Sequence, residues 1–380
     1  MRDALLGVLL GVVLLATSPA LAAVLPEDRI DILYHGYEGD GLDVSGPSVL
    51  VRKSIADKVS VWGNYYVDSV SSASIDVVTT ASEYTEERDQ VSAGIDYLRN
   101  KTSIALSWTK SDEDDYEGNA VRFGISQDFF GDLTTLGISY SRGWDTVRRN
   151  GDEIFEEEAK HQSWRVDLTQ VISPSFILSL NYEGISDEGF LNNPYRQVRF
   201  VDPSAARGFS FEAERYPGTR TSSAVALRGL YYLPYRAALK GEGRFYTDSW
   251  GITAYNAELA YTHPLEEGLT LDVRYRFYNQ TSADFYSDLF SRSNQQNFLA
   301  RDKELASFNS HTVGIGMSYE FETPGLPFVE RGQASLFFDQ ILFQYDDFRD
   351  LRVTGNVAVG EEPLYDFNAA VIRAFVSFYF

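Results

Sequence analysis

The chain contains no cysteine among its 380 residues, and beyond its N-terminal segment it contains no long apolar run. Without cysteine, disulfides and thiolate metal sites are excluded, so the fold is held together by hydrogen bonding and packing. A membrane-spanning helix needs roughly 18 or more consecutive apolar residues, and no later segment approaches that length. The four histidines are scattered with no pair at metal-ligand spacing. We therefore expect no metal site and no cofactor.

The one apolar run lies at the front of the chain, in MRDALLGVLLGVVLLATSPALAA. Arg2 opens it, residues 5–16 form its apolar core, and Ala20 and Ala22 supply small residues for cleavage. The run is too short for a stable membrane span. It predicts a secretory signal peptide over residues 1–22, followed by a mature chain over residues 23–380.

Basic residues are scarce, with 33 Lys and Arg against 55 Asp and Glu and a net charge of −22. Nucleic acids reward basic surfaces, so we expect no nucleic-acid partner. Residues 111–119 are rich in carboxylates but lack the ligand spacing of a calcium loop. This segment is interpreted as a solvated loop or as a place of loose cation bridging to lipopolysaccharide.

The sequence offers little for nucleophilic catalysis. Ser310 and His311 are neighbours in the chain, but adjacent residues of a strand point to opposite faces. A nucleophile and its base need hydrogen-bond contact, so this pair is a poor dyad. We expect no enzymatic activity.

Segments of about ten residues with alternating character are abundant. In residues 269–278, for example, Leu271, Val273 and Tyr275 fall on one face, while Asp272 and Arg274 fall on the other. Tight turns rich in Gly, Pro, Asn, Asp and Ser alternate with longer acidic connections. The longer connections are expected at residues 71–87, 111–119, 148–160, 188–220, 282–309 and 349–366.

A membrane barrel has short turns at one rim and long loops at the other, whereas a soluble sandwich has no reason for that asymmetry. The pattern therefore predicts an all-β fold, a single transmembrane antiparallel up-and-down β-barrel of about 16 strands, within a range of roughly 14 to 18. Its short turns are expected in the periplasm and its long loops outside the cell. The expected strand centres are Leu33, Leu50, Tyr65, Ile95, Leu106, Phe123, Ile138, Val166, Leu180, Leu227, Gly243, Ala257, Val273, Ile315, Phe337 and Phe375. A bulge is expected at residues 340–343, where the alternation breaks.

The sequence ends in AAVIRAFVSFYF, with Phe378 and Phe380 on the apolar face of a period-2 strand. We expect this strand to close the barrel against the first and to end in an aromatic girdle at the periplasmic interface. Phe380 and Phe378 are predicted to serve as an assembly signal for the machinery that inserts barrels into the outer membrane.

Three segments carry a family resemblance: ISQDFFGDLTTLGISYSRGWD at residues 125–145, NYYVDSVSSAS at residues 64–74 and YTEER at residues 84–88. Together with the closing strand, they make the chain similar to an uncharacterised family of Gram-negative proteins of comparable length, known as a domain of unknown function. The resemblance runs over essentially the whole mature chain. It implies an outer-membrane β-barrel in a Gram-negative bacterium and says nothing about a substrate or about functional residues.

Placing the apolar face against lipid leaves a charged face toward the lumen. The residues predicted to line the lumen are Asp68, Asp96, Arg122, Asp128, Arg165, Arg228, Lys240, Glu242, Arg244, Asp272, Arg274, Arg276 and Arg373. Two interpretations remain open. The charges either border water and select polar solutes, or pair with neighbours across strands and merely brace the wall, since Glu242, Arg244, Asp272 and Arg274 could pair locally.

Two functions are consistent with these features. The first is a passive or weakly selective channel for small hydrophilic solutes. The second is a barrel scaffold that holds a lipoprotein or a periplasmic redox partner. In either case we expect contact with outer-membrane lipid and lipopolysaccharide. The sequence does not decide whether the segments at 188–220 and 282–309 fold over the lumen.

Overall fold

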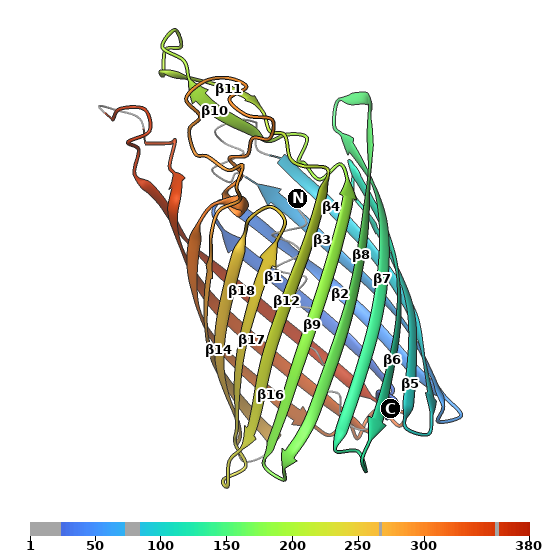
Figure 1. The fold of residues 1–380 in the computed structure, drawn as a ribbon. Coiled ribbons are helices and arrows are strands. Elements are labelled where there is room, and N and C mark those ends of the chain that lie inside the picture. The colour runs from blue at the N-terminus through green and yellow to red at the C-terminus, as the bar shows by residue number, and fades with distance from the viewer. Residues whose placement is uncertain (1–23, 73–83, 266–267, 354–356) are drawn as a thin grey trace.

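The chain forms a closed antiparallel β-barrel in the computed structural model, which describes residues 24–72, 84–265, 268–353 and 357–380 (Figure 1). Sixteen strands make up the barrel within this described part of the chain, so the predicted fold class is confirmed. Each strand centre expected from the alternation lies inside a barrel strand. The predicted signal peptide, residues 1–22, lies outside the described residues.

The first half of the barrel runs from β1 to β9. Its strands are β1 (Arg29–Gly39), β2 (Leu42–Ile55), β3 (Val59–Ser72), β4 (Tyr84–Arg99), β5 (Thr102–Asp112), β6 (Tyr116–Phe129), β7 (Thr134–Arg149), β8 (Asp152–Ser173) and β9 (Phe176–Gly189). A separate hairpin follows, formed by β10 (Gln197–Val201) and β11 (Phe209–Ala213). The second half consists of β12 (Thr219–Tyr232), β13 (Ala238–Asp248), β14 (Thr253–Pro264), β15 (Leu269–Gln280), β16 (Phe308–Phe321), β17 (Arg331–Arg349) and β18 (Leu364–Tyr379). A 3-10 turn, η2 (Lys303–Leu305), precedes β16.

Each barrel strand pairs with the barrel strands before and after it in the sequence. Two pairings join strands that are not consecutive, namely β9 with β12 and β1 with β18. β9 pairs with β12 because the β10–β11 hairpin stands outside the wall. β1 pairs with β18 over its whole length, from Arg29 opposite Tyr379 to Gly39 opposite Ala369. Closure leaves the barrel without an unpaired edge, which a β-structure in lipid requires.

The two faces of the wall differ in chemistry. Val273 and Tyr275 on β15 are 42% and 46% exposed, and apolar side chains are similarly exposed around the outer face. Arg274 and Arg276 alternate with them on the inner face. An apolar outer face and a charged inner face are the pattern of a barrel in lipid. Among the described residues, no helix has the length and apolar character needed to cross a bilayer.

The connections divide the barrel into a turn rim, where β2–β3 and similar tight turns lie, and a loop rim, where the long connections lie (Figure 1). Two of the long loops predicted from the sequence, at residues 111–119 and 148–160, are short connections instead. Residues 113–115 are the whole of one connection and residues 150–151 the whole of the other, because β5 to β8 continue as paired strands beyond the expected ends. Polar strands in water keep pairing, since each further pair satisfies two more backbone groups.

The bulge expected at residues 340–343 is also misplaced. The register of β17 against β18 runs without interruption from Arg331 to Gln344 and shifts only between Gln344 and Arg349. Ile341 and Phe343 simply place apolar side chains on the inner face, where they pack near the loop rim. The alternation of the backbone continues although the alternation of polarity does not.

Candidate functional site

The charged residues predicted for the lumen project from the inner face of the barrel. Asp68, Asp96, Arg122 and Asp128 stand on β3, β4 and β6, and Arg165 stands on β8. The remaining ones lie on β12 (Arg228), β13 (Lys240, Glu242, Arg244), β15 (Asp272, Arg274, Arg276) and β18 (Arg373). Each alternates with outward-facing neighbours, as strand geometry requires.

Most basic side chains of strands β12 to β15 form an ion pair with a carboxylate. Arg228 Nη2 lies 2.6 Å from Glu242 Oε2, and Lys240 Nζ lies 2.9 Å from Glu258 Oε1. Arg244 Nη2 donates to Glu183 Oε2 at 2.9 Å, on β9 two strands away. The local pairing expected from the sequence holds for Glu242, which pairs with Arg228 on the neighbouring strand, whereas Arg244 and Arg274 pair with carboxylates two strands away. Asp272 instead accepts a hydrogen bond from Thr262 Oγ1 at 2.5 Å.

Arg274 also pairs with a carboxylate two strands away. Its Nε and Nη2 donate to the two oxygens of Asp339 at 2.8 and 2.5 Å, although β16 lies between β15 and β17. The inner position of β16 in that row is Gly314, where a Cβ would lie 2.1 Å from Asp339 Oδ1. The glycine therefore opens the gap through which the guanidinium crosses. Asp339 also accepts from Arg373 Nη2 at 2.8 Å.

A network that the sequence interpretation missed lies farther toward the loop rim. Asp68 is fully buried and accepts from His35 Nε2 at 2.6 Å and from Arg88 Nη2. Tyr66 stacks on His35 with ring centroids 4.9 Å apart. Strand parity alone would have placed His35 and Arg88 on the inner face with Asp68. The buried charges of Asp68 and Arg88 are paired, as low-dielectric surroundings demand.

The wall from β4 to β9 is lined by small hydroxyl side chains. Ser92 bonds Thr109 at 2.9 Å, and Thr169 bonds Ser179 at 2.9 Å. Arg122 on β6 projects from the inner face of this wall, and its Nη2 donates to Ser139 Oγ at 3.1 Å. It is exposed although it stands on the inner face. A longer charged side chain, Arg165, stands on the same wall and donates to Asp167 at 2.8 Å.

Three connections of the loop rim fold together above the barrel, and we call residues 190–218, 281–307, 350–353 and 357–363 the cap (Figure 1). A fully buried Arg199 donates to Glu362 through Nη1 (2.7 Å) and Nη2 (3.0 Å), and to Asp288. Arg301 Nη2 lies 2.9 Å from Asp288 Oδ1. Val198, Phe290 and Leu299 form an apolar cluster beside these ion pairs. The segments that the sequence left open therefore form one packed body at the mouth.

The cap also contains a buried carboxyl group. Glu214 Oε1 accepts from the backbone N–H of Arg301 at 2.6 Å, and its other oxygen accepts from the hydroxyl of Tyr216. Burial, with the nearby charge of Asp302, raises the pKa of Glu214 to about 8. Arg196 also lies near Glu214, and its Nε is 3.8 Å from Asp302 Oδ2.

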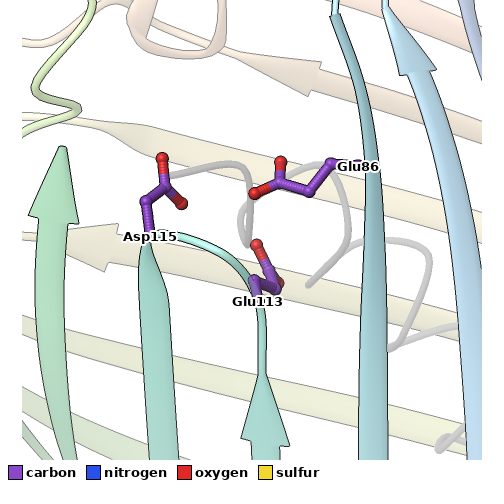
Figure 2. Close-up of side chains that lie close together, drawn as sticks. All are labelled: Glu86, Glu113 and Asp115. Atoms are coloured by element: carbon purple, nitrogen blue, oxygen red, sulfur yellow. The ribbon is translucent and has the colours of Figure 1, made fainter. Parts of the chain in front are cut away.

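Three carboxylates lie close together near the β5–β6 connection. Two of them belong to residues 111–119, the carboxylate-rich segment that lacks the ligand spacing of a calcium loop. Figure 2 shows Glu86 of β4 pointing toward Glu113 and Asp115, and one oxygen of each lies within 4.8 Å of the others. Asp115 Oδ2 also accepts from Tyr195 Oη of the cap at 2.5 Å. The contact joins this rim of the barrel to the cap, and we assign no cation to it.

A family model described as "Protein of unknown function (DUF3570)" matches residues 80–326. The chain belongs to this family. The resemblance inferred from the three sequence segments is thereby confirmed. The matched range of the family includes β12 to β15 and the loops around Arg199 and Asp288, whereas Asp339, Glu362 and Arg373 lie beyond it.

No protein with a curated function matches the chain. Among solved structures, a bacterial polysaccharide outer membrane secretin aligns with 8% identity over 94% of this chain and 100% of its own, with a TM-score of 0.49. OpdK of Pseudomonas aeruginosa, solved with vanillate, aligns with 10% identity over 93% and 99%, with a TM-score of 0.44. The siderophore receptor PirA of Pseudomonas aeruginosa aligns with 12% identity over 93% of this chain and 63% of its own, with a TM-score of 0.44. Identities this low carry no information on solutes or partners.

Proposed function

We propose that the protein is a non-enzymatic outer-membrane channel of a Gram-negative bacterium that passes small hydrophilic solutes. In this arrangement the turn rim faces the periplasm, and the loop rim with its cap faces the outside. The outer face contacts lipid, and the acidic loop rim lies beside lipopolysaccharide. The barrel assembly machinery inserts the chain through its closing strand.

One observation supports this proposal above all, namely that Arg122 is exposed on the inner face. Its hydrogen-bond acceptor, Ser139 Oγ, is uncharged, and no carboxylate forms an ion pair with Arg122 among the described residues. An unpaired charge in a dry interior is prohibitively costly, so the space beside Arg122 has to contain water. The lumen along β5 to β8 is therefore suited to conduct ions and polar solutes.

The cap limits what the channel passes. It lies over the mouth, and buried ion pairs join its segments into one body. A fixed body above a water-filled lumen excludes large molecules and admits those small enough to pass around it. This arrangement favours ions and small solutes over polymers.

Planar-bilayer recording of the purified, heat-modifiable barrel tests the proposal. We expect stepwise single-channel conductance in KCl and permeation of small sugars in a liposome-swelling assay. A folded barrel that conducts neither ions nor sugars would overturn the channel. The scaffold alternative then gains support if a lipoprotein or a periplasmic redox protein copurifies with the barrel in stoichiometric amounts.

A further inference from the structure

The inner wall from β12 to β18 carries more cations than carboxylates that hold them. Arg228, Lys240 and Arg244 each have a carboxylate of their own. Arg274 and Arg373 share one, because both donate to Oδ2 of Asp339. One guanidinium of this pair is therefore in surplus over the ion-paired carboxylates, and the remaining inner carboxylate of β15, Asp272, bonds Thr262 instead.

A second surplus charge stands on Arg276. No carboxylate lies within ion-pair distance of its guanidinium among the described residues, and Glu258 on the neighbouring strand is held by Lys240. Its guanidinium carbon lies 5.9 Å from the centroid of the Tyr278 ring. On the other side, Thr312 of β16 is directly opposite Arg276 and offers a hydroxyl.

The two surplus charges lie close together. Arg274 and Arg276 are separated by one residue on the same face of β15, so their Cα atoms are about 7 Å apart. Arg274 uses Nε and Nη2 for Asp339, which leaves Nη1 for a further acceptor. Arg373 adds positive charge beside Arg274, because both guanidinium groups meet at Asp339 Oδ2. Donors converge on this patch without matching acceptors.

We propose that Arg276 and Arg274, supported by Arg373, form an oxyanion-binding site in the lumen, which makes small carboxylated or phosphorylated solutes the favoured cargo. The inference rests on the proposed channel function, because the solute has to reach the patch through water. Guanidinium groups present paired N–H donors that match the oxygens of carboxylate and phosphate. The hydroxyl of Thr312 is placed to complete the shell of donors.

The structure separates the roles of the two arginines on β15. Removing Arg274 also releases Asp339, so its loss changes the wall as well as the site. Removing Arg276 breaks no ion pair in the described structure. Arg276→Gln is therefore the informative variant, and Lys101→Gln is its matched control, since Lys101 pairs with Asp132 at the exposed turn rim.

The experiment measures reversal potentials of single channels in a KCl gradient, and then block of the current by inorganic phosphate or acetate. In Arg276→Gln we expect the chloride-to-potassium permeability ratio to fall at least about threefold, because losing one unit charge about 7 Å away in water changes the energy of chloride and of potassium by about RT each, in opposite directions. Block by the oxyanions should weaken by a similar factor, while Lys101→Gln matches the parent protein. Stronger block by phosphate than by acetate at equal concentration assigns the site to phosphorylated solutes, and the reverse order assigns it to carboxylates.

Two results have different meanings. If the parent protein conducts but Arg276→Gln leaves both the permeability ratio and the block unchanged, the oxyanion site is wrong and the channel stands. If the parent protein passes neither ions nor sugars, the channel is wrong. Thermal unfolding of the folded barrel with phosphate and with acetate then tests whether the oxyanion site exists. A rise in unfolding temperature that Arg276→Gln abolishes supports the site, and the absence of any rise in the parent protein overturns it.

Discussion

Arg274 on β15 reaches Asp339 on β17 only because Gly314 occupies the inner position of the strand between them. The relationship makes Gly314 a sensitive position. A Cβ there would lie 2.8 Å from Arg274 Cγ as well as 2.1 Å from Asp339 Oδ1. A methyl group would therefore push the guanidinium away and leave a buried carboxylate with Arg373 alone.

Gly314→Ala should lower the stability of the barrel by about 1–3 kcal/mol, the usual result of weakening a buried charged hydrogen bond. Thermal unfolding in detergent measures this as a lower midpoint. Gly124→Ala is the control, because a Cβ at that inner position meets only ordinary contacts at 3.7–3.9 Å. Equal midpoints for the two variants would show that the gap at Gly314 is not needed.

Replacing Arg199 should loosen the cap and leave the barrel intact. Arg199→Leu leaves Glu362 without its guanidinium, and breaking a buried ion pair typically costs about 3–5 kcal/mol. We expect faster proteolysis within residues 281–307 and 357–363, larger single-channel conductance and unchanged heat-modifiability. Arg215→Gln serves as control, since Arg215 bonds only neutral acceptors of Asn294 and Gln296. Proteolysis at the parental rate in Arg199→Leu would contradict the role of this ion pair.

The cap should become less stable as pH rises from about 4.5 to about 8. The pKa of Glu214 is raised from 4.5 to about 8, mainly by burial, so the closed cap holds a proton that the opened cap releases. Opening therefore becomes easier with rising pH, by at most about 1.4 kcal/mol per pH unit. Asp302 and Arg196 face the same group and act on this titration.

Amide hydrogen exchange of residues 297–302, corrected for the intrinsic effect of pH, measures this opening. Glu214→Gln keeps an acceptor for the N–H of Arg301 and lacks the titrating proton, so its opening should vary less with pH. The same pH dependence in Glu214→Gln and the parent chain would assign the effect to another group.

The absence of cysteine makes the two faces of the wall directly testable. Ile138 is 49% exposed on the outer face of β7, and Ser139 follows it on the inner face. In membranes, Ser139→Cys should react with a charged, membrane-impermeant thiol reagent, whereas Ile138→Cys should react at least tenfold more slowly, on the order expected for a thiol in lipid. Equal labelling of the two cysteines would contradict a water-filled lumen bordered by lipid.

Much of the architecture could be predicted from the sequence. A strand alternates its side chains with a period of two, so the pattern around Leu271 to Tyr275 indicates both a strand and its lipid face. For the same reason Arg122, Arg228 and Arg276 could be placed on the inner face without knowing any neighbour. Turn residues such as those near Asn100 marked the strand ends, because a positive φ there suits asparagine.

The tertiary structure alone decided which groups meet. Arg199 and Glu362 are 163 residues apart in the chain, and only the folding of three loops into one cap brings them together. Arg274 binds Asp339 rather than Asp272 because Gly314 on the intervening strand has no side chain to block the contact. Alternation along one strand carries no information about side chains that cross to another strand. Partner choice in the lumen depends on the register and on the volume of the residues between, and these exist only in the closed barrel.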